Sequence, residues 1–177
     1  SQGRLNDVAR NLQTVGTLTE RIGVITGELR TFARQPGAAT SAIALEDAID
    51  GALALLRPSL RAARIEVRRI RSAQPLHVIA NRVRLEQVLV NLLQNSADAL
   101  ADCTERTIEI RTGSDGDCNW AEVADSGPGI PEERIPLLFK PFTSSKPLGL
   151  GLGLVICKDI IEQYGGSLVF QRSQLGG

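Results

Sequence analysis

Residues 84–100 read RLEQVLVNLLQNSADAL. Its apolar residues recur at spacings of three and four, which predicts a helix with one buried stripe. Asn91 and Asn95 are four residues apart and therefore lie one turn above each other on one face. A buried amide needs partners for its oxygen and its NH₂ group, so the pair either joins a polar network in the core or binds a ligand. The predicted stripe comprises Leu85, Val88, Leu89, Leu92, Leu93 and Ala97.

Three further stretches follow this helix. Residues 125–130 read DSGPGI after a predicted strand, residues 139–146 read FKPFTSSK, and residues 149–154 read GLGLGL before another helix. Glycines allow close approach of the backbone to a ligand, and N–H groups at the start of a helix attract an anion. Each stretch alone has a simpler explanation. A glycine run is often only a turn, and an Asp at the end of a strand often caps the turn that follows. No GxxxxGK[ST] phosphate loop occurs in the chain.

The four stretches together, in this order and within about seventy residues, resemble the nucleotide-binding boxes of the sensor histidine kinase ATP-binding domain. That domain belongs to the GHKL (Bergerat) group, with Hsp90, DNA gyrase B and MutL. The resemblance covers residues 41–172. It implies a two-layer α/β sandwich, with a mixed and mostly antiparallel sheet covered by helices on one face, and it implies ATP and Mg²⁺ as ligands.

The resemblance also implies a role for each matching side chain. Asn95 would bind Mg²⁺, and Asn91 would hold a water or phosphate oxygen in the metal's shell. Asp125 would accept a hydrogen bond from the adenine amino group, and Lys146 would pair with the terminal phosphate. Phe139 and Phe142 would act as hydrophobic latches of a lid formed by residues 126–148. The remaining nucleotide contacts are expected at Gly127, Gly129, Ile130, Thr143, Gly149, Leu150, Gly151, Leu152, Gly153 and Leu154.

The residue at position 91 separates two enzyme classes. The resembling hydrolases carry Glu there as a general base, whereas Asn has no basic site to activate water. Asn91 and Lys146 are therefore expected to serve transfer of the ATP γ-phosphoryl group to a histidine outside this chain, by positioning and charge stabilisation. The implied partners are the phosphoacceptor hairpin of the same kinase and the receiver domain of a response regulator, which accepts the phosphate on an aspartate.

Residues 1–35 are expected to form the second helix of the dimerisation and histidine-phosphotransfer hairpin, with residues 36–40 as a linker and 41–177 as the catalytic domain. Residues 4–34 carry an apolar seam that no single helix can bury alone, so a partner helix or a second chain is needed. The alternative is a helix packed on its own domain. The stretch LTERIGVITGELRTFAR is similar to the C4-dicarboxylate-sensing kinases. The full protein is expected to be a homodimer, and the family's last strand is expected to be missing from the chain.

The intervening residues predict short elements of a layered sheet. Residues 46–56 have one apolar helix face, and residues 41–45, 76–80 and 107–112 are predicted strands. Residues 65–70 alternate apolar and basic residues as a half-buried strand with Ile65, Val67 and Ile70 on its apolar side. The glycine-rich helix is expected over 150–164, and a strand over 167–171. His77, the only histidine, lies in strand-like sequence and is rejected as the phosphoacceptor.

The amino-acid composition narrows the possible classes of protein further. Lys+Arg 20 against Asp+Glu 20 gives no net charge, and aromatic residues make up 3%, which argues against nucleic-acid binding. Three cysteines without a CxxC pair indicate reduced thiols. No apolar run reaches the roughly 20 residues of a membrane span. The resemblance to sensor histidine kinases implies a cytoplasmic domain of an inner-membrane sensor. The alternatives are a GHKL serine kinase of the anti-sigma type, a related dehydrogenase kinase, and a degenerate module that only binds nucleotide or dimerises.

Overall fold

The computed structural model describes residues 39–143 and 150–176. The predicted helix at 1–35 and the candidate site residues Lys146 and Gly149 lie outside these ranges. The elements in chain order are β1 (Ser41–Ala44), α2 (Leu45–Ala62), β2 (Glu66–Ile70), β3 (His77–Ala80), α3 (Arg82–Ala99), β4 (Thr107–Ser114), β5 (Asn119–Asp125), the 3-10 helix η1 (Glu132–Leu137) and α4 (Gly153–Gln163).

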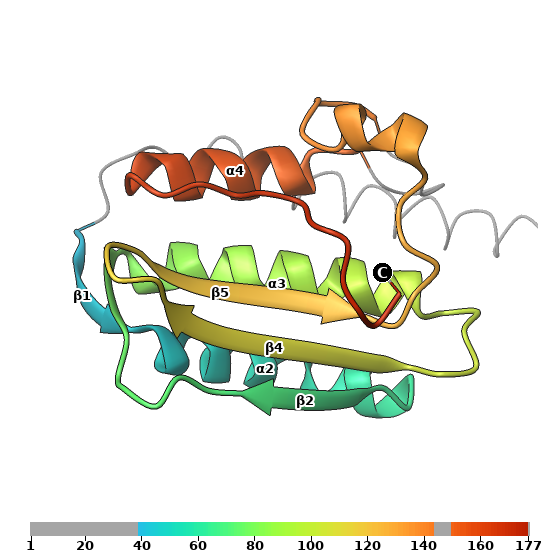
Figure 1. Cartoon of the computed structure of the whole chain (residues 1–177), viewed down its shortest axis with the longest axis horizontal. Helices are drawn as coiled ribbons and strands as arrows, with labels where there is room; N and C mark the ends of the chain where they lie inside the picture. The colour runs from blue at the N-terminus through green and yellow to red at the C-terminus, as the bar shows by residue number, and fades with distance from the viewer. Residues whose placement is uncertain (1–38, 144–149, 177) are drawn as a thin grey trace, which may run out of the picture.

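The strands form two sheets. β1 pairs with β3 in an antiparallel ribbon, while β2, β4 and β5 form a sheet in that order, with β2 and β4 parallel and β4 and β5 antiparallel. Figure 1 shows α2 and α3 behind the larger sheet and α4 alongside α3. The predicted α/β architecture, with mostly antiparallel strands and helices on one face of the sheet, is therefore confirmed.

α3 is the element shared by both hydrophobic cores. The larger core joins Leu85, Leu89 and Leu93 of α3 to α2 and to Ile108 and Ile110 of β4. A smaller core joins Val88 of α3 to one face of α4. Asn81 caps the start of the helix by accepting a hydrogen bond from the Arg84 N–H at 3.1 Å. The predicted apolar stripe is thus buried, with Leu92 and Ala97 at its half-buried margin.

One prediction about β2 is wrong. Ile70 is 49% exposed, and Arg69 is the residue whose side chain turns inward beside Val67. Side chains alternate between the two faces of a strand. Val67 and Arg69 therefore lie on one face, and Ile70 lies on the other. Arg69 is stabilised there by ion pairs to Glu46 and Asp50 of α2, the latter at 2.7 Å.

The C-terminal region differs from prediction in two places. The last helix begins at Gly153 rather than at residue 150, because Gly151 has φ of +69° and no α-helix continues through that conformation. Residues 167–171 form no strand, although Leu168 and Phe170 alternate as half-buried residues with exposed neighbours. A strand requires hydrogen bonding to a neighbouring strand, and no described strand pairs with this segment. Among the described residues, no helix has the length and apolarity needed to cross a membrane.

Candidate functional site

Asn91 faces the beginning of α4. Its Nδ2 donates a hydrogen bond to the Gly153 carbonyl oxygen at 2.9 Å and to the Cys157 sulfur at 3.4 Å. Asn91 is half-buried and lies on the face of α3 that includes Val88, which packs on α4. Asn95 follows one turn later and is also half-buried. The two amides predicted to act together thus lie on one helix face, beside the glycine-rich stretch.

Asp125 ends β5 and holds the turn that follows it. Its Oδ1 accepts a hydrogen bond from the Gly127 N–H at 2.9 Å. A Cβ on Gly127 would lie 2.6 Å from this oxygen and 3.3 Å from the Ala99 Cβ at the end of α3, so a larger residue here would displace the Asp125 carboxylate. The turn-capping role of Asp125 is therefore present in the structure, and it occupies one carboxylate oxygen. No described residue donates a hydrogen bond to the second oxygen.

The glycine-rich stretch brings free backbone N–H groups next to Asn91. Gly151 has a positive φ, and no side chain caps the first turn of α4, which therefore has N–H groups without helical partners. Leu152 is buried with Val88 and Ile156, and Leu150 packs partly against the same core. The leucines of this stretch fix the helix start in the core, and its backbone is the part suited to bind an anion.

The lid residues are only partly arranged as expected. The Phe139 ring lies 5.5 Å from the Lys158 ammonium nitrogen of α4, a cation–π contact that joins the lid to the helix. Phe142 is 74% exposed with φ of +64°, so in this conformation it latches nothing. The Thr143 hydroxyl lies 2.7 Å from the carbonyl oxygens of Leu137 and Lys140, and it donates to one of them at a time. Thr143 therefore stabilises the lid itself.

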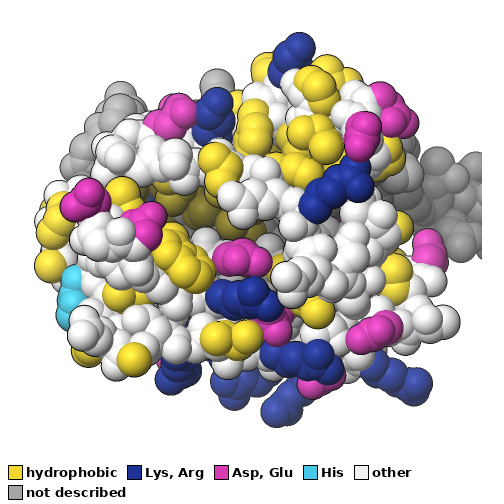
Figure 2. Space-filling view, viewed as in Figure 1, with side chains coloured by type: hydrophobic (Ala, Val, Ile, Leu, Met, Phe, Trp, Pro, Cys, Tyr) yellow, Lys and Arg dark blue, Asp and Glu magenta, His cyan; other side chains and the backbone are white. Residues whose placement is uncertain are grey.

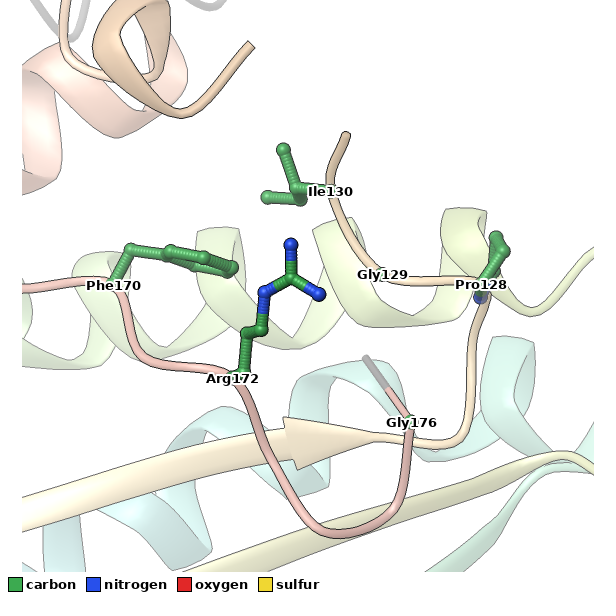
Figure 3. A pocket seen from close by; sticks show the side chains of 6 residues that line it. All are labelled: Pro128, Gly129, Ile130, Phe170, Arg172 and Gly176. Carbon is green, nitrogen blue, oxygen red and sulfur yellow. The ribbon is translucent and has the colours of Figure 1, made fainter. Parts of the chain in front are cut away.

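A shallow pocket that is open to solvent lies beside the Asp125 turn. Gly129 and Ile130, two of the predicted nucleotide contacts, line it from one side, and Gly129 has φ of +72°. Phe170 and Arg172 line it from the C-terminal segment, and Figure 3 shows both side chains directed toward Ile130. Sequence reasoning missed these two residues, because only folding brings the C-terminal segment back to the end of β5. Figure 2 shows a hollow on this face with hydrophobic side chains on its floor.

The remaining polar residues define what the site lacks. His77 lies in β3 and is exposed, as predicted for a residue outside the site. The described residues contain no group of three His, Cys, Asp or Glu side chains able to hold a metal ion. Mg²⁺ is commonly bound by one or two protein oxygens together with phosphates and waters. The amide oxygens of Asn91 and Asn95 are of the right chemical type for that arrangement.

Two stacked amides, an aspartate at a strand end and glycine-rich turns at a helix start thus occur together in one α/β domain. The family described as histidine kinase-, DNA gyrase B- and HSP90-like ATPase matches residues 80–177. The chain belongs to this family.

Its relatives are sensor histidine kinases. The C4-dicarboxylate transport sensor protein DctB of Rhizobium meliloti (strain 1021) is 39% identical over 175 residues, which are 99% of this chain and 28% of that protein. DctB of Pseudomonas aeruginosa is 34% identical over 177 residues, or 98% of this chain and 29% of that protein. The chain thus spans less than a third of these relatives.

Solved structures agree with this assignment. The nucleotide-free catalytic domain of the histidine kinase ThkA is 34% identical with a TM-score of 0.63, covering 71% of this chain and 81% of that one. ThkA in complex with the response regulator protein TrrA is 28% identical with a TM-score of 0.70, covering 86% of this chain and 43% of that one. The chain is therefore homologous to histidine kinase catalytic domains, as the order of its motifs predicted.

Proposed function

We propose that the chain binds Mg·ATP between α3, the Asp125 turn and the start of α4. In the complete protein it transfers the γ-phosphoryl group to a histidine outside residues 1–177. The observation that carries the proposal is the hydrogen bond of Asn91 to Gly153, because it places a predicted phosphate-binding amide at the uncapped helix start. Bound Mg²⁺ would neutralise charge on the phosphates, with Asn95 as its protein ligand.

The residues of the chain divide the remaining tasks. Asp125 accepts a hydrogen bond from the adenine amino group with the carboxylate oxygen not used by Gly127. The backbone of residues 151–155 and Lys146 contact the phosphates. Asn91 supplies no general base, so a water molecule is poorly activated and ATP is kept for the histidine. The receiving hairpin, a response-regulator receiver domain, dimerisation and an inner-membrane sensor as the parent protein belong to the same proposal. Similarity to DctB extends over nearly the whole chain and supports it.

Isothermal titration calorimetry of the 177-residue chain with a non-hydrolysable ATP analogue tests the binding step. We expect binding that is at least tenfold tighter with Mg²⁺ than without it. Asn95→Ala should remove most of this Mg²⁺ dependence, because it deletes a metal ligand. Gln94→Ala is the matched control, since Gln94 is an exposed residue of the same helix and its described hydrogen bond is to Asp98, at 2.8 Å. Absence of binding by the unaltered chain would disprove the proposal.

The transfer step is tested by adding the phosphoacceptor hairpin in trans with radiolabelled ATP. We expect acid-labile label on the hairpin and none on the chain alone. His77→Gln should leave the labelling unchanged, because His77 lies in a strand away from the site. Label on a hydroxyl residue of the partner would instead indicate a serine kinase.

A further inference from the structure

We propose that Cys157 and Gly153 of α4 are positioning residues for Asn91. They hold its amide nitrogen, so that its amide oxygen is the end presented to the bound nucleotide and its metal. This inference rests on the proposed function, because it concerns how the same site is ordered.

The chemistry of the acceptors fixes the orientation of the Asn91 amide. A backbone carbonyl oxygen can only accept a hydrogen bond, so the NH₂ end must face Gly153, at 2.9 Å. The same NH₂ group lies 3.4 Å from the Cys157 sulfur. Both of its hydrogens thus have acceptors on α4. No described residue donates a hydrogen bond to the Asn91 oxygen, which leaves that atom for a ligand.

Cys157 is placed to act as an acceptor and a donor at once. It is 1% exposed, and its thiol lies 3.8 Å from the Val88 carbonyl oxygen, to which it donates. Burial raises the pKa of the Cys157 thiol to about 12, with the Asn91 hydrogen bond opposing the shift. The sulfur therefore stays protonated at neutral pH. From one turn inside α4, the Cys157 thiol contacts α3 through two groups: it donates to the Val88 carbonyl oxygen and accepts from the Asn91 amide.

Gly153 acts by the absence of a side chain. A Cβ at this position would lie 3.0 Å from both Nδ2 and Oδ1 of Asn91, closer than nearly all real Cβ contacts. An alanine there would displace the Asn91 amide by a few tenths of an ångström and so disturb its hydrogen bond to the Gly153 carbonyl oxygen. The glycine thus leaves room for the Asn91 side chain against α4, independently of any contact with phosphate. Locking a ligand-binding side chain in this way lowers the cost of ordering it on binding.

The test compares Cys157→Val with Cys157→Ser in calorimetric titrations of the 177-residue chain with the ATP analogue. Valine fills the space but accepts no hydrogen bond, whereas serine keeps both functions of the thiol. We expect Cys157→Val to weaken binding about threefold to tenfold with Mg²⁺, the effect of losing one hydrogen bond. The loss should be less than about twofold without Mg²⁺, because Asn91 acts on the metal's shell. Cys157→Ser should bind within about twofold of the unaltered chain in both conditions.

Two further variants complete the experiment. Cys118→Val alters an exposed cysteine far along the chain from α4 and should change nothing. Gly153→Ala should weaken Mg²⁺-dependent binding at least as much as Cys157→Val, and it tests the proposal if the cysteine variants fold poorly. Thermal unfolding of each variant separates positioning from stability, since Cys157→Val should lose affinity without a matching loss of Tm.

Equal affinities of the valine and serine variants would overturn the inference, as would an equal loss with and without Mg²⁺. Either result, with the unaltered chain still binding the analogue, leaves the proposed function standing. Failure of the unaltered chain to bind would instead refute the proposed function itself.

Discussion

Asp125 and Asn91 each use one end of the side chain to hold the backbone of the site. Asp125 Oδ1 accepts from the Gly127 N–H at 2.9 Å, and Asn91 Nδ2 donates to the Gly153 carbonyl oxygen at 2.9 Å. The opposite end of each group is left for a ligand. A side chain held in this way has little rotamer freedom to lose when a ligand binds, which favours affinity.

The three cysteines should differ sharply in reactivity. Cys118 is exposed, Cys103 is intermediate and Cys157 is buried. Only the thiolate reacts with thiol reagents, and the pKa of Cys157 is raised to about 12 by burial. At pH 8 we expect Ellman's reagent to label Cys118 rapidly and Cys157 only at the rate of unfolding, as read by mass spectrometry of the labelled peptides.

The same shift fixes the direction of a pH effect on stability. The unfolded thiol ionises near its reference pKa of 9.0, whereas the folded thiol holds its proton to about 12. The stabilising contribution of Cys157 is therefore complete below pH 9.0 and is lost as the pH rises toward about 12. Cys157→Val should flatten that part of the stability profile. Rapid labelling of Cys157 in the folded chain at pH 8 would contradict its burial.

At the level of elements, a polar network joins α2 to the sheet. Glu46 of α2 pairs with Arg69 of β2, and it accepts a hydrogen bond from the Thr112 hydroxyl of β4 at 2.7 Å. The Arg69 side chain is only 16% exposed and also contacts Asp50. Removing Arg69 leaves the half-buried Glu46 carboxylate with the more exposed Arg71, at 3.1 Å, as its remaining described ion-pair partner. This cost exceeds that of losing an exposed ion pair.

Arg69→Ala and Arg68→Ala change neighbouring residues of β2. Urea unfolding should therefore give different free energies of unfolding for the two variants. We expect Arg69→Ala to lower the free energy of unfolding by about 1–3 kcal/mol. Arg68→Ala is the control, because the described ion pair of Arg68 is with Glu66 and their side chains are 46% and 60% exposed. Its effect should stay within about 0.5 kcal/mol. Equal effects of the two substitutions would show that the inward position of Arg69 contributes nothing to the free energy of unfolding.

Sequence periodicity predicted the elements whose apolar pattern is regular. α3 and the strands β3 and β4 lie within a few residues of their predicted ranges. It failed where a single residue's surroundings decide the outcome. Ile70 was taken as inward because it is apolar, but the alternation of β2 gives that face to Arg69, which α2 compensates with two carboxylates.

The start of α4 could not be predicted because it depends on one backbone angle. Residues 150–152 fit a helical apolar pattern, yet the positive φ of Gly151 delays the helix to Gly153. The strand expected at 167–171 shows a different limit. Its alternation is present, but a strand also needs a neighbour for its hydrogen bonds, and a pattern within one segment does not supply that neighbour.

For the whole molecule, the site lies where the two hydrophobic cores meet. α3 packs on the sheet through one core and on α4 through the other, so the face carrying Asn91 and Asn95 is held from both sides. The motif order indicated which segments converge, and the structure places Asn91 against the glycine-rich stretch. Phe170 and Arg172 line the pocket because of the path that the chain takes after α4, and no sequence motif marks these two residues.

A ligand that binds only the folded chain raises its stability, which makes thermal unfolding a test of the whole arrangement. With Mg·ATP at 100 times its Kd the gain is about 2.7 kcal/mol, which for a chain of this size raises Tm by about 5–10 °C.

Asp125→Asn keeps an oxygen for the Gly127 N–H but replaces the second acceptor by an NH₂ group. If it weakens binding tenfold, as loss of a charged hydrogen bond predicts, the gain at the same concentration falls to about 1.4 kcal/mol. The Tm shift should then be about halved, while Mg·GTP should give the unaltered chain almost none, since guanine offers no amino group at that position. An equal Tm shift with ATP and GTP would show that Asp125 does not recognise the purine.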